Sequence, residues 1–221
     1  MNSRGRIITF EGINGVGKST QAHLLAKSLE KAGHRVRLIK YPQYDHPVGE
    51  LIRRYLHGEF GAKEKLFDFA AMLYAADRAQ NISLYDELLS AGVTIIHDRY
   101  REASWGILTS LFDDPAVRDD KLEWLLLLEK HLPPSDLVLY LDLPVDAAYQ
   151  QMALRELWDT HETDRSFMEA CKMRYDELST RFGWVRMAGM AGGQLKTTEQ
   201  RQLEIMQAVT ARFPELAEGQ S

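Results

Sequence analysis

The sequence predicts an α/β fold in which a parallel sheet carries helices on both faces. Segments of strand-like and helix-like character alternate along the chain, which is the pattern of consecutive βαβ units. Residues 93–96 and 137–141 are continuously apolar, as expected of central strands that are buried on both faces. The chain has 221 residues, of which 45% are apolar, and this is enough for one packed core. We therefore expect a single domain over residues 1–221.

The first half of the chain is predicted to contain two strands, each followed by helix. An apolar strand leads into a glycine-rich turn, and the next segment has leucines at helical spacing. Gly33 stands where the C-cap of that helix is expected, and Pro42 ends the second strand. The elements expected here are strands over residues 6–10 and 36–41 and helices over residues 18–31, 46–56 and 63–89.

The second half continues the alternation. Asp98 closes the third strand, Pro133 and Pro134 end a leucine-rich helix, and Pro144 separates the fourth strand from the next helix. The elements expected here are strands over residues 93–97, 137–143 and 184–187 and helices over residues 120–131, 145–155, 164–181 and 197–213.

The composition limits the partners and the location of the chain. Lys and Arg number 27 against 32 Asp and Glu, a net charge of −5, which argues against a dedicated nucleic-acid binder. Cys171 is the single cysteine, so no intrachain disulfide can form. No apolar run reaches the length of a membrane span, and the first residues lack the apolar stretch of a signal peptide. We expect a cytoplasmic protein with neither a nucleic-acid nor a membrane partner.

A phosphate-binding loop follows the first strand. Residues 12–19 fit the pattern G-x-x-x-x-G-K-[ST], and they stand between a strand and a helix as this motif requires. Glycines let the backbone turn its N–H groups toward an anion, and the helix N-terminus adds partial positive charge. Lys18 is expected to reach the β- and γ-phosphates of ATP, and Ser19 to supply an oxygen to Mg²⁺. The residues predicted to bind ATP are Gly12, Asn14, Gly15, Val16, Gly17, Lys18, Ser19 and Thr20.

The charge distribution agrees with a small anionic ligand at this loop. Residues 1–40 hold eight Lys or Arg against two Asp or Glu, so the acidity of the chain resides in the remainder. A locally basic pocket can therefore hold phosphate esters although the whole chain is acidic.

Two strands end in an aspartate, Asp98 and Asp142, and either could help to hold Mg²⁺. We expect Asp98 to do so and Asp142 to have a structural role. Arg99 follows Asp98, at the carboxyl end of a central strand, where ligands of open α/β sheets bind. A phosphate is the natural partner of its planar fork, and a salt bridge to a nearby carboxylate is the alternative.

Aromatic and arginine side chains on a predicted helix form a second candidate site. Tyr74 and Arg78 are four residues apart and share a helix face, so the ring could stack on a base while the arginine bonds to base or phosphate oxygens. The alternative is an ordinary core tyrosine beside a solvated arginine. Tyr41 and Tyr44 flank Pro42 at a strand end, which is again a crevice position.

Taken together, these motifs resemble those of the thymidylate kinase family, whose members transfer the γ-phosphoryl group of ATP to dTMP. The resemblance covers roughly residues 6–182 and implies a P-loop NTPase fold with a five-stranded parallel sheet and a small lid over roughly residues 154–164. It also implies a homodimer. The motifs that carry it are Phe10-Glu11-Gly12, the phosphate-binding loop, residues 32–35, Tyr41-Pro42, residues 73–78, Asp98-Arg99-Tyr100, residues 141–144 and residues 174–178.

The resemblance implies roles for individual residues. Arg99 would hold the dTMP phosphate with Tyr44 near it, while Tyr74 would stack on thymine and Arg78 would bond to its carbonyl oxygen. In this family an arginine near the transferred group comes from the loop or the lid, and because the loop has Gly15, the lid is expected to supply it. Arg155 and Arg165 are the candidates, and Arg155 is favoured. The implied catalytic residues are Lys18, Arg99 and Arg155, the substrate-binding residues are Tyr41, Tyr44, Tyr74, Arg78, Asp98, Arg99, Ser104 and Tyr175, and the residues near Mg²⁺ are Ser19 and Asp98.

The sequence departs from the family pattern where the base is read. Asn14 replaces an acidic residue, Ala103 and Ser104 stand where Ser and often Asn are usual, and Ile107 and Leu108 replace an aromatic or His followed by Gln. An altered base preference is therefore one alternative. A deoxynucleoside kinase, with Asp98 or Glu102 as its base, is a second, and a nucleotide-binding switch without catalysis is a third.

Overall fold

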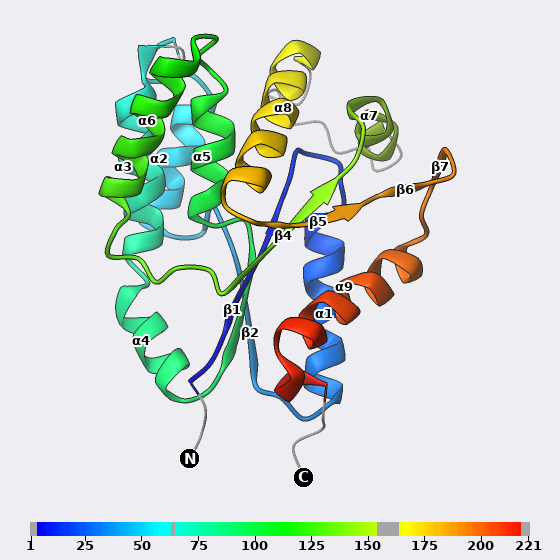
Figure 1. The fold of residues 1–221 in the computed structure, drawn as a ribbon. Helices are drawn as coiled ribbons and strands as arrows, with labels where there is room; N and C mark the ends of the chain where they lie inside the picture. Colours follow the sequence, from blue (N-terminus) through cyan, green and yellow to red (C-terminus); the bar gives the residue numbers. More distant parts are fainter. Residues whose placement is uncertain (1–3, 63–64, 154–163, 218–221) are drawn as a thin grey trace.

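Five parallel strands form the centre of the molecule. The computed structural model describes residues 4–62, 65–153 and 164–217. The strand order is β2-β3-β1-β4-β5, so the chain starts near the middle of the sheet and adds strands on both sides (Figure 1). The strands are β1 (Ile7–Glu11), β2 (Val36–Lys40), β3 (Thr94–Asp98), β4 (Leu137–Asp142) and β5 (Val185–Ala188).

Helices cover both faces of this sheet. Figure 1 shows α1 and α9 together on one face, and α4, α5 and α8 on the other. A further group, α2, α3 and α6, packs outside α5. The helices are α1 (Lys18–Lys31), α2 (Pro47–Leu56), α3 (Phe67–Ala79), α4 (Ile82–Ser90), α5 (Arg101–Thr109), α6 (Pro115–Leu128), α7 (Val145–Ala153), α8 (Arg165–Arg181) and α9 (Thr198–Arg212). No helix within the described ranges is long and apolar enough to cross a membrane.

The strand register brings polar strand ends to one edge. Phe10 of β1 is level with Asp98 of β3, and Glu11 is level with Tyr140 of β4. Because all these strands are parallel, their carboxyl ends meet there. The loops after β1 and β3 therefore converge where ligands of such sheets bind.

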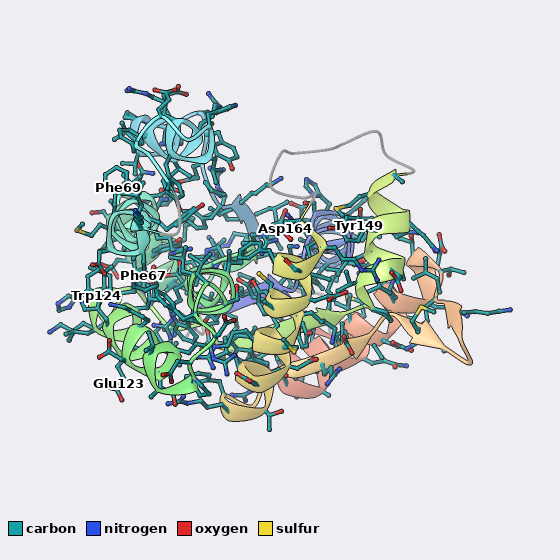
Figure 2. The ribbon with its side chains drawn as sticks, turned by 90° about the horizontal axis from the view of Figure 1, so that it is seen from above. Phe67, Phe69, Glu123, Trp124, Tyr149 and Asp164 are labelled. Atoms are coloured by element: carbon teal, nitrogen blue, oxygen red, sulfur yellow. The ribbon has the colours of Figure 1, made fainter. Side chains whose placement is uncertain are left out.

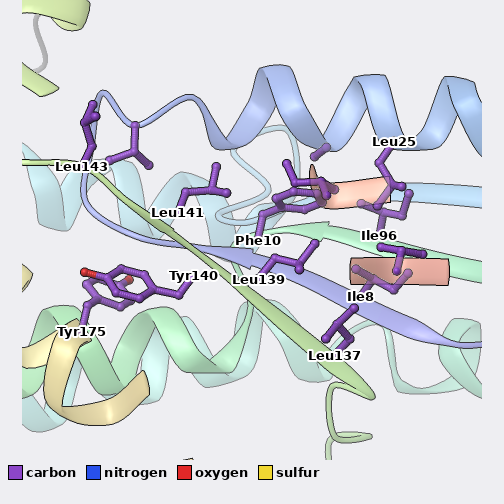
Figure 3. Close-up of a cluster of buried hydrophobic side chains, with 14 of the residues drawn as sticks. Ile8, Phe10, Leu25, Ile96, Leu137, Leu139, Tyr140, Leu141, Leu143 and Tyr175 are labelled. Carbon is purple, nitrogen blue, oxygen red and sulfur yellow. The ribbon is translucent and has the colours of Figure 1, made fainter. Parts of the chain in front are cut away.

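Apolar side chains between the sheet and α1 form the main core. Phe10 and Ile96 point toward Leu25 of α1, and all three are fully buried (Figure 3). Across the sheet, the rings of Tyr140 and Tyr175 stack with centroids 5.7 Å apart. This packing fixes α8 against β4 close to the polar edge.

A separate aromatic cluster holds the outer helices. The ring of Phe67 on α3 lies 5.4 Å from that of Phe112 and 6.2 Å from that of Trp124 on α6. Seen from above, Phe67 and Trp124 lie together on the side of the molecule away from Tyr149 on α7 (Figure 2). The outer helices thus have a core of their own.

The α/β prediction is confirmed, and the five strands correspond to the five that were expected. The prediction of one helix over residues 63–89 is wrong, because α3 ends at Ala79 and α4 begins at Ile82. Between them, the Asn81 side chain donates to the Tyr41 hydroxyl at 2.8 Å and to Gln43 Oε1 at 2.6 Å. These long-range hydrogen bonds stabilise the interruption between α3 and α4.

Two further elements differ from expectation. Helix α5 was not predicted, and α6 begins at Pro115 rather than at residue 120, with Asp114 accepting a hydrogen bond from Ala116 N. Met190–Ala191 (β6) and Gln194–Leu195 (β7), which were not predicted, pair as a hairpin. Gly192 and Gly193, both with positive φ, form its turn.

Candidate active site

The phosphate-binding loop joins β1 to α1. The Lys18 ammonium donates to the backbone oxygens of Gly12 at 3.1 Å and Ile13 at 2.7 Å. Burial and the nearby Arg99 charge lower the pKa of Lys18 to about 7, and the Asp98 carboxylate opposes this shift. The lysine is therefore enclosed by the loop that it is predicted to serve.

Gly15 is required by the packing of the loop. Its φ is +80°, and a Cβ atom built there would stand 2.4 Å from the backbone oxygen of Ala148 on α7. A side chain at this position would have to displace α7. The loop therefore has no room for an arginine at position 15.

Ser19 and Asp98 meet beside the loop. The Ser19 hydroxyl donates to Asp98 Oδ2, and Lys40 Nζ lies 4.0 Å from the same oxygen. Asp98 is nearly fully buried at the end of β3. A hydroxyl and a carboxylate are oxygen ligands of the kind that Mg²⁺ prefers, so the two residues fit such an ion.

Arg99 turns back toward the loop. Its φ of 69° is in the left-handed region, which few residues other than glycine adopt. Its Nη2 donates to Asn14 Oδ1 at 2.5 Å, and its Nη1 donates to the Tyr175 hydroxyl at 3.2 Å. The structure thus brings together the predicted residues Asn14, Arg99 and Tyr175 from three segments of the chain.

Glu11 lies behind Arg99 and was not among the predicted site residues. Its carboxylate accepts hydrogen bonds from Tyr100 N and from the Tyr175 hydroxyl, both at 2.9 Å, and lies 3.8 Å from Arg99 Nη1. Burial raises the pKa of Glu11 to about 7, although the Arg99 charge opposes this shift. The signal in the sequence was an ionisable residue at the end of an apolar strand.

A second cluster surrounds Arg78 on α3. Its Nη1 donates to Ser104 Oγ at 3.0 Å and to the Glu129 carboxylate. The guanidinium carbon lies 6.0 Å from the ring centroids of both Tyr74 and Tyr41. Arg78 is only 2% exposed, so the alternative of a solvated arginine is wrong.

The two tyrosines after β2 have different surroundings. Tyr41 is buried, and its hydroxyl bonds with Tyr85 as well as with Asn81. Tyr44 is half-buried with the Arg53 guanidinium 5.3 Å from its ring. Burial raises the pKa of Tyr74, and the Tyr44 hydroxyl adds to this shift.

Arg155, like residues 154–163 of the expected lid, lies outside the described residues.

Asp142, at the end of β4, forms ion pairs with Lys172 at 2.9 Å and Arg186 at 2.6 Å, which agrees with a structural role.

Comparison with known proteins gives a consistent result. The family model of thymidylate kinase matches residues 10–188. A probable thymidylate kinase from Thermococcus kodakarensis is 38% identical over 179 residues, 77% of this chain and 82% of the relative. Human thymidylate kinase is 35% identical over 146 residues, 66% of this chain and 65% of the human protein.

A solved structure agrees over nearly the whole chain. The thymidylate kinase of Candida albicans, described as having broad substrate specificity, superposes with a TM-score of 0.75 at 26% identity, covering 96% of this chain and 93% of its own. From the match to the family model and these relatives, we conclude that the chain belongs to the thymidylate kinase family.

Proposed function

We propose that this chain transfers the γ-phosphoryl group of ATP to dTMP, giving dTDP for dTTP synthesis. The observation that carries the proposal is the hydrogen bond from Arg99 to Asn14, which holds a second cationic group against the phosphate-binding loop. One cation, Lys18, belongs to the donor side, and the other, Arg99, would exchange its bonds to Asn14 and Tyr175 for an acceptor phosphate. Phosphoryl transfer depends mainly on such positioning and on charge neutralisation.

On the donor side, residues 12–20 hold ATP, with the loop N–H groups directed at its phosphates. Lys18 exchanges its backbone partners for phosphate oxygens. Ser19 and Asp98 would hold Mg²⁺, which would neutralise negative charge on the ATP phosphates.

On the acceptor side, Arg99 holds the dTMP phosphate with Tyr44 near it. Tyr74 stacks on the thymine ring, and Arg78 with Ser104 bonds to its edge, while Tyr41 lines the base pocket. Tyr175 lies beside the deoxyribose. The acceptor oxygen is already anionic, so no general base has to remove a proton.

The remaining proposals concern the whole chain. Residues 1–221 form one kinase domain whose lid, residues 154–164, closes over the phosphates, brings Arg155 to the transferred group and excludes water. The protein acts in the cytoplasm as a homodimer.

A panel of acceptors with ATP and Mg²⁺ tests this function. We expect ADP release to depend on dTMP, and thymidine, dCMP and dGMP to support much less turnover. The Lys18→Ala variant, which lacks the loop cation, is expected to be inactive and controls for contaminating kinases. Turnover with thymidine but not with dTMP would instead indicate a deoxynucleoside kinase, and nucleotide binding without transfer would indicate a switch.

An altered base preference is a second candidate. It is favoured by Ala103, Ile107 and Leu108, which replace residues that read the base edge in the family pattern. The broad specificity described for the Candida albicans relative shows that the fold can accept it. Comparable turnover of dTMP and another monophosphate in the same panel would support this candidate, and strict use of dTMP would exclude it.

A further inference from the structure

Glu129 forms a buried ion pair with Arg78. Glu129 is the C-cap of α6, and Arg78 lies 51 positions earlier on α3. Their side chains are 1% and 3% exposed, and no other ion pair in the described part of the chain has both partners so deeply buried. Breaking such a pair by removing one partner leaves an uncompensated charge in the interior.

The contacts of Arg78 with Glu129 and Ser104 use only one of its three nitrogen atoms. Nη1 makes the bonds to Glu129 and to Ser104, whereas Nε is buried and has no partner among the described residues. Burial alone would lower the pKa of Arg78, but the Glu129 carboxylate reverses this effect and raises it. Glu129 therefore balances the charge of the buried guanidinium and fixes its plane through Nη1, leaving N–H groups that can serve another acceptor.

The Arg78 guanidinium lies beside Tyr74, whose ring is proposed to stack on the base. The Arg78 guanidinium carbon is 6.0 Å from the centroid of Tyr74. A base stacked on Tyr74 would present its edge near the arginine. Every N–H of a guanidinium is a donor, so this edge must carry an acceptor.

We propose that Glu129 is a positioning residue that holds Arg78 as a permanent hydrogen-bond donor and so makes the site select a pyrimidine with a carbonyl over one with an amino group at the same place. Thymine and uracil carry the oxygen O4, whereas cytosine carries an amino group, which would place donor against donor. The inference rests on the proposed function and adds a determinant of specificity that lies in none of the motifs of the sequence.

The Glu129→Gln variant tests this assignment, because it keeps the shape and an acceptor oxygen but removes the charge. We expect the KM for dTMP to rise about tenfold to a hundredfold, the range for one hydrogen bond to a charged group. The KM for ATP should stay within about twofold, and the ratio of kcat/KM for dTMP to that for dCMP should fall about tenfold. Glu129→Asp, which retains the charge, should restore part of the ratio.

A matched control removes a carboxylate that pairs with a different buried arginine. Glu177→Gln withdraws a partner of Arg174, whose side chain is 5% exposed, and should leave the ratio unchanged. If Glu129→Gln has the wild-type ratio and KM for dTMP, the inference is overturned while the proposed function stands. A wild-type enzyme that does not phosphorylate dTMP overturns both.

A second background keeps the test informative if the single variant does not fold. Arg78→Met combined with Glu129→Gln removes both charges from the interior. If Glu129 acts through Arg78, the double variant and Arg78→Met should have the same ratio of dTMP to dCMP turnover. A further fall of the ratio in the double variant would mean that Glu129 acts on the base without Arg78, and would overturn the assignment.

Discussion

Three ionisable side chains lie together where β1 and β3 end: Glu11 and Lys18 are buried, and Arg99 is half-buried. Burial shifts the pKa values of Glu11 and Lys18 toward each other, both to about 7. Such opposed shifts are typical of functional sites, where charged groups are kept out of water to act on a ligand. The candidate site is therefore a small group of ionisable side chains that the folded chain positions before a ligand binds.

Replacing Arg99 with alanine should weaken the binding of dTMP much more than the binding of ATP. Arg99 bonds to Asn14 and Tyr175 and makes none of the contacts of Lys18 with the loop backbone. We expect Arg99→Ala to raise the KM for dTMP about a hundredfold and to change the affinity for ATP only slightly, as measured by steady-state kinetics and nucleotide titration. Equal losses for both substrates would mean that Arg99 is structural.

His97 should make the fold sensitive to acid. Its ring lies 3.2 Å from the Tyr85 hydroxyl, and burial lowers its pKa from 6.5 to about 3, with the Arg78 charge adding to the shift. Between these pH values the unfolded chain binds a proton that the folded chain does not, so stability falls as the pH falls.

Urea unfolding at pH 7 and at pH 4.5 measures this effect. We expect the histidine to account for about 2–3 kcal/mol of the loss of unfolding free energy between the two pH values. His97→Asn should lose correspondingly less, although it starts from a lower stability, while the surface control His131→Asn should behave as the wild type. An undiminished loss in His97→Asn would contradict the assignment.

At the scale of elements, the phosphate-binding loop and α7 are packed in direct contact. Gly15 is the point of contact, and α7 leads toward the segment that is expected to form the lid. A side chain at position 15 would therefore have to displace either the loop or α7.

A matched pair of glycines tests this contact. Gly15→Ala introduces both an unfavourable φ and a clash with Ala148, whereas Gly58→Ala has a similar φ of +79° and open space around it. We expect Gly58→Ala to cost about 1 kcal/mol and Gly15→Ala at least about twice as much, with a higher KM for ATP in Gly15→Ala alone. Equal melting temperatures for the two variants would mean that α7 can shift to accommodate a side chain at position 15 at little energetic cost.

Sequence patterns identified elements with strong local signals and missed those that depend on distant contacts. The apolar runs of β3 and β4 and the phosphate-binding loop were evident from the chain itself. The break between α3 and α4 was not evident, because it depends on hydrogen bonds from Asn81 to Tyr41 and Gln43, which are far from it in the sequence. Helix α5 has no side-chain cap at Tyr100, so its start had no local signal.

The candidate site shows the same limit. The motifs predicted Lys18, Arg99 and Arg78, because their spacing is local. Glu129 pairs with Arg78 only through the packing of α6 against α5 and α3, and no periodicity reports that contact. The hairpin of β6 and β7 could have been predicted, since Gly192-Gly193 is a strong turn signal.

At the scale of the molecule, the outer helices offer an apolar surface. Leu51 on α2, Met72 on α3 and Leu127 on α6 are 39%, 50% and 62% exposed. These helices lie on the side away from α1 and α9 (Figure 1). A second copy of the chain could cover them, since apolar side chains are stabilised when they are removed from water.

Sedimentation equilibrium tests the homodimer. We expect a mass twice the 25.3 kDa of one chain, and Met72→Glu, which places a charge among the apolar side chains of the outer helices, should shift the equilibrium toward the monomer. Leu203→Glu alters a side chain of α9 that is 62% exposed on the other side, and should leave the dimer intact. A monomer at micromolar concentration, or equal dissociation by both variants, would contradict this arrangement.

The left-handed backbone of Arg99 has a conformational cost that the side chain at this position must offset. An arginine at φ 69° is less favourable than a glycine by about 1 kcal/mol, so Arg99→Gly should melt at a higher temperature than Arg99→Ala while being equally deficient with dTMP. Differential scanning calorimetry of the two variants would measure the difference, and identical melting temperatures would show that the backbone relaxes. Arg99 occupies this backbone position because its guanidinium reaches Asn14 and Tyr175, and a glycine would lose both contacts together with the acceptor phosphate site.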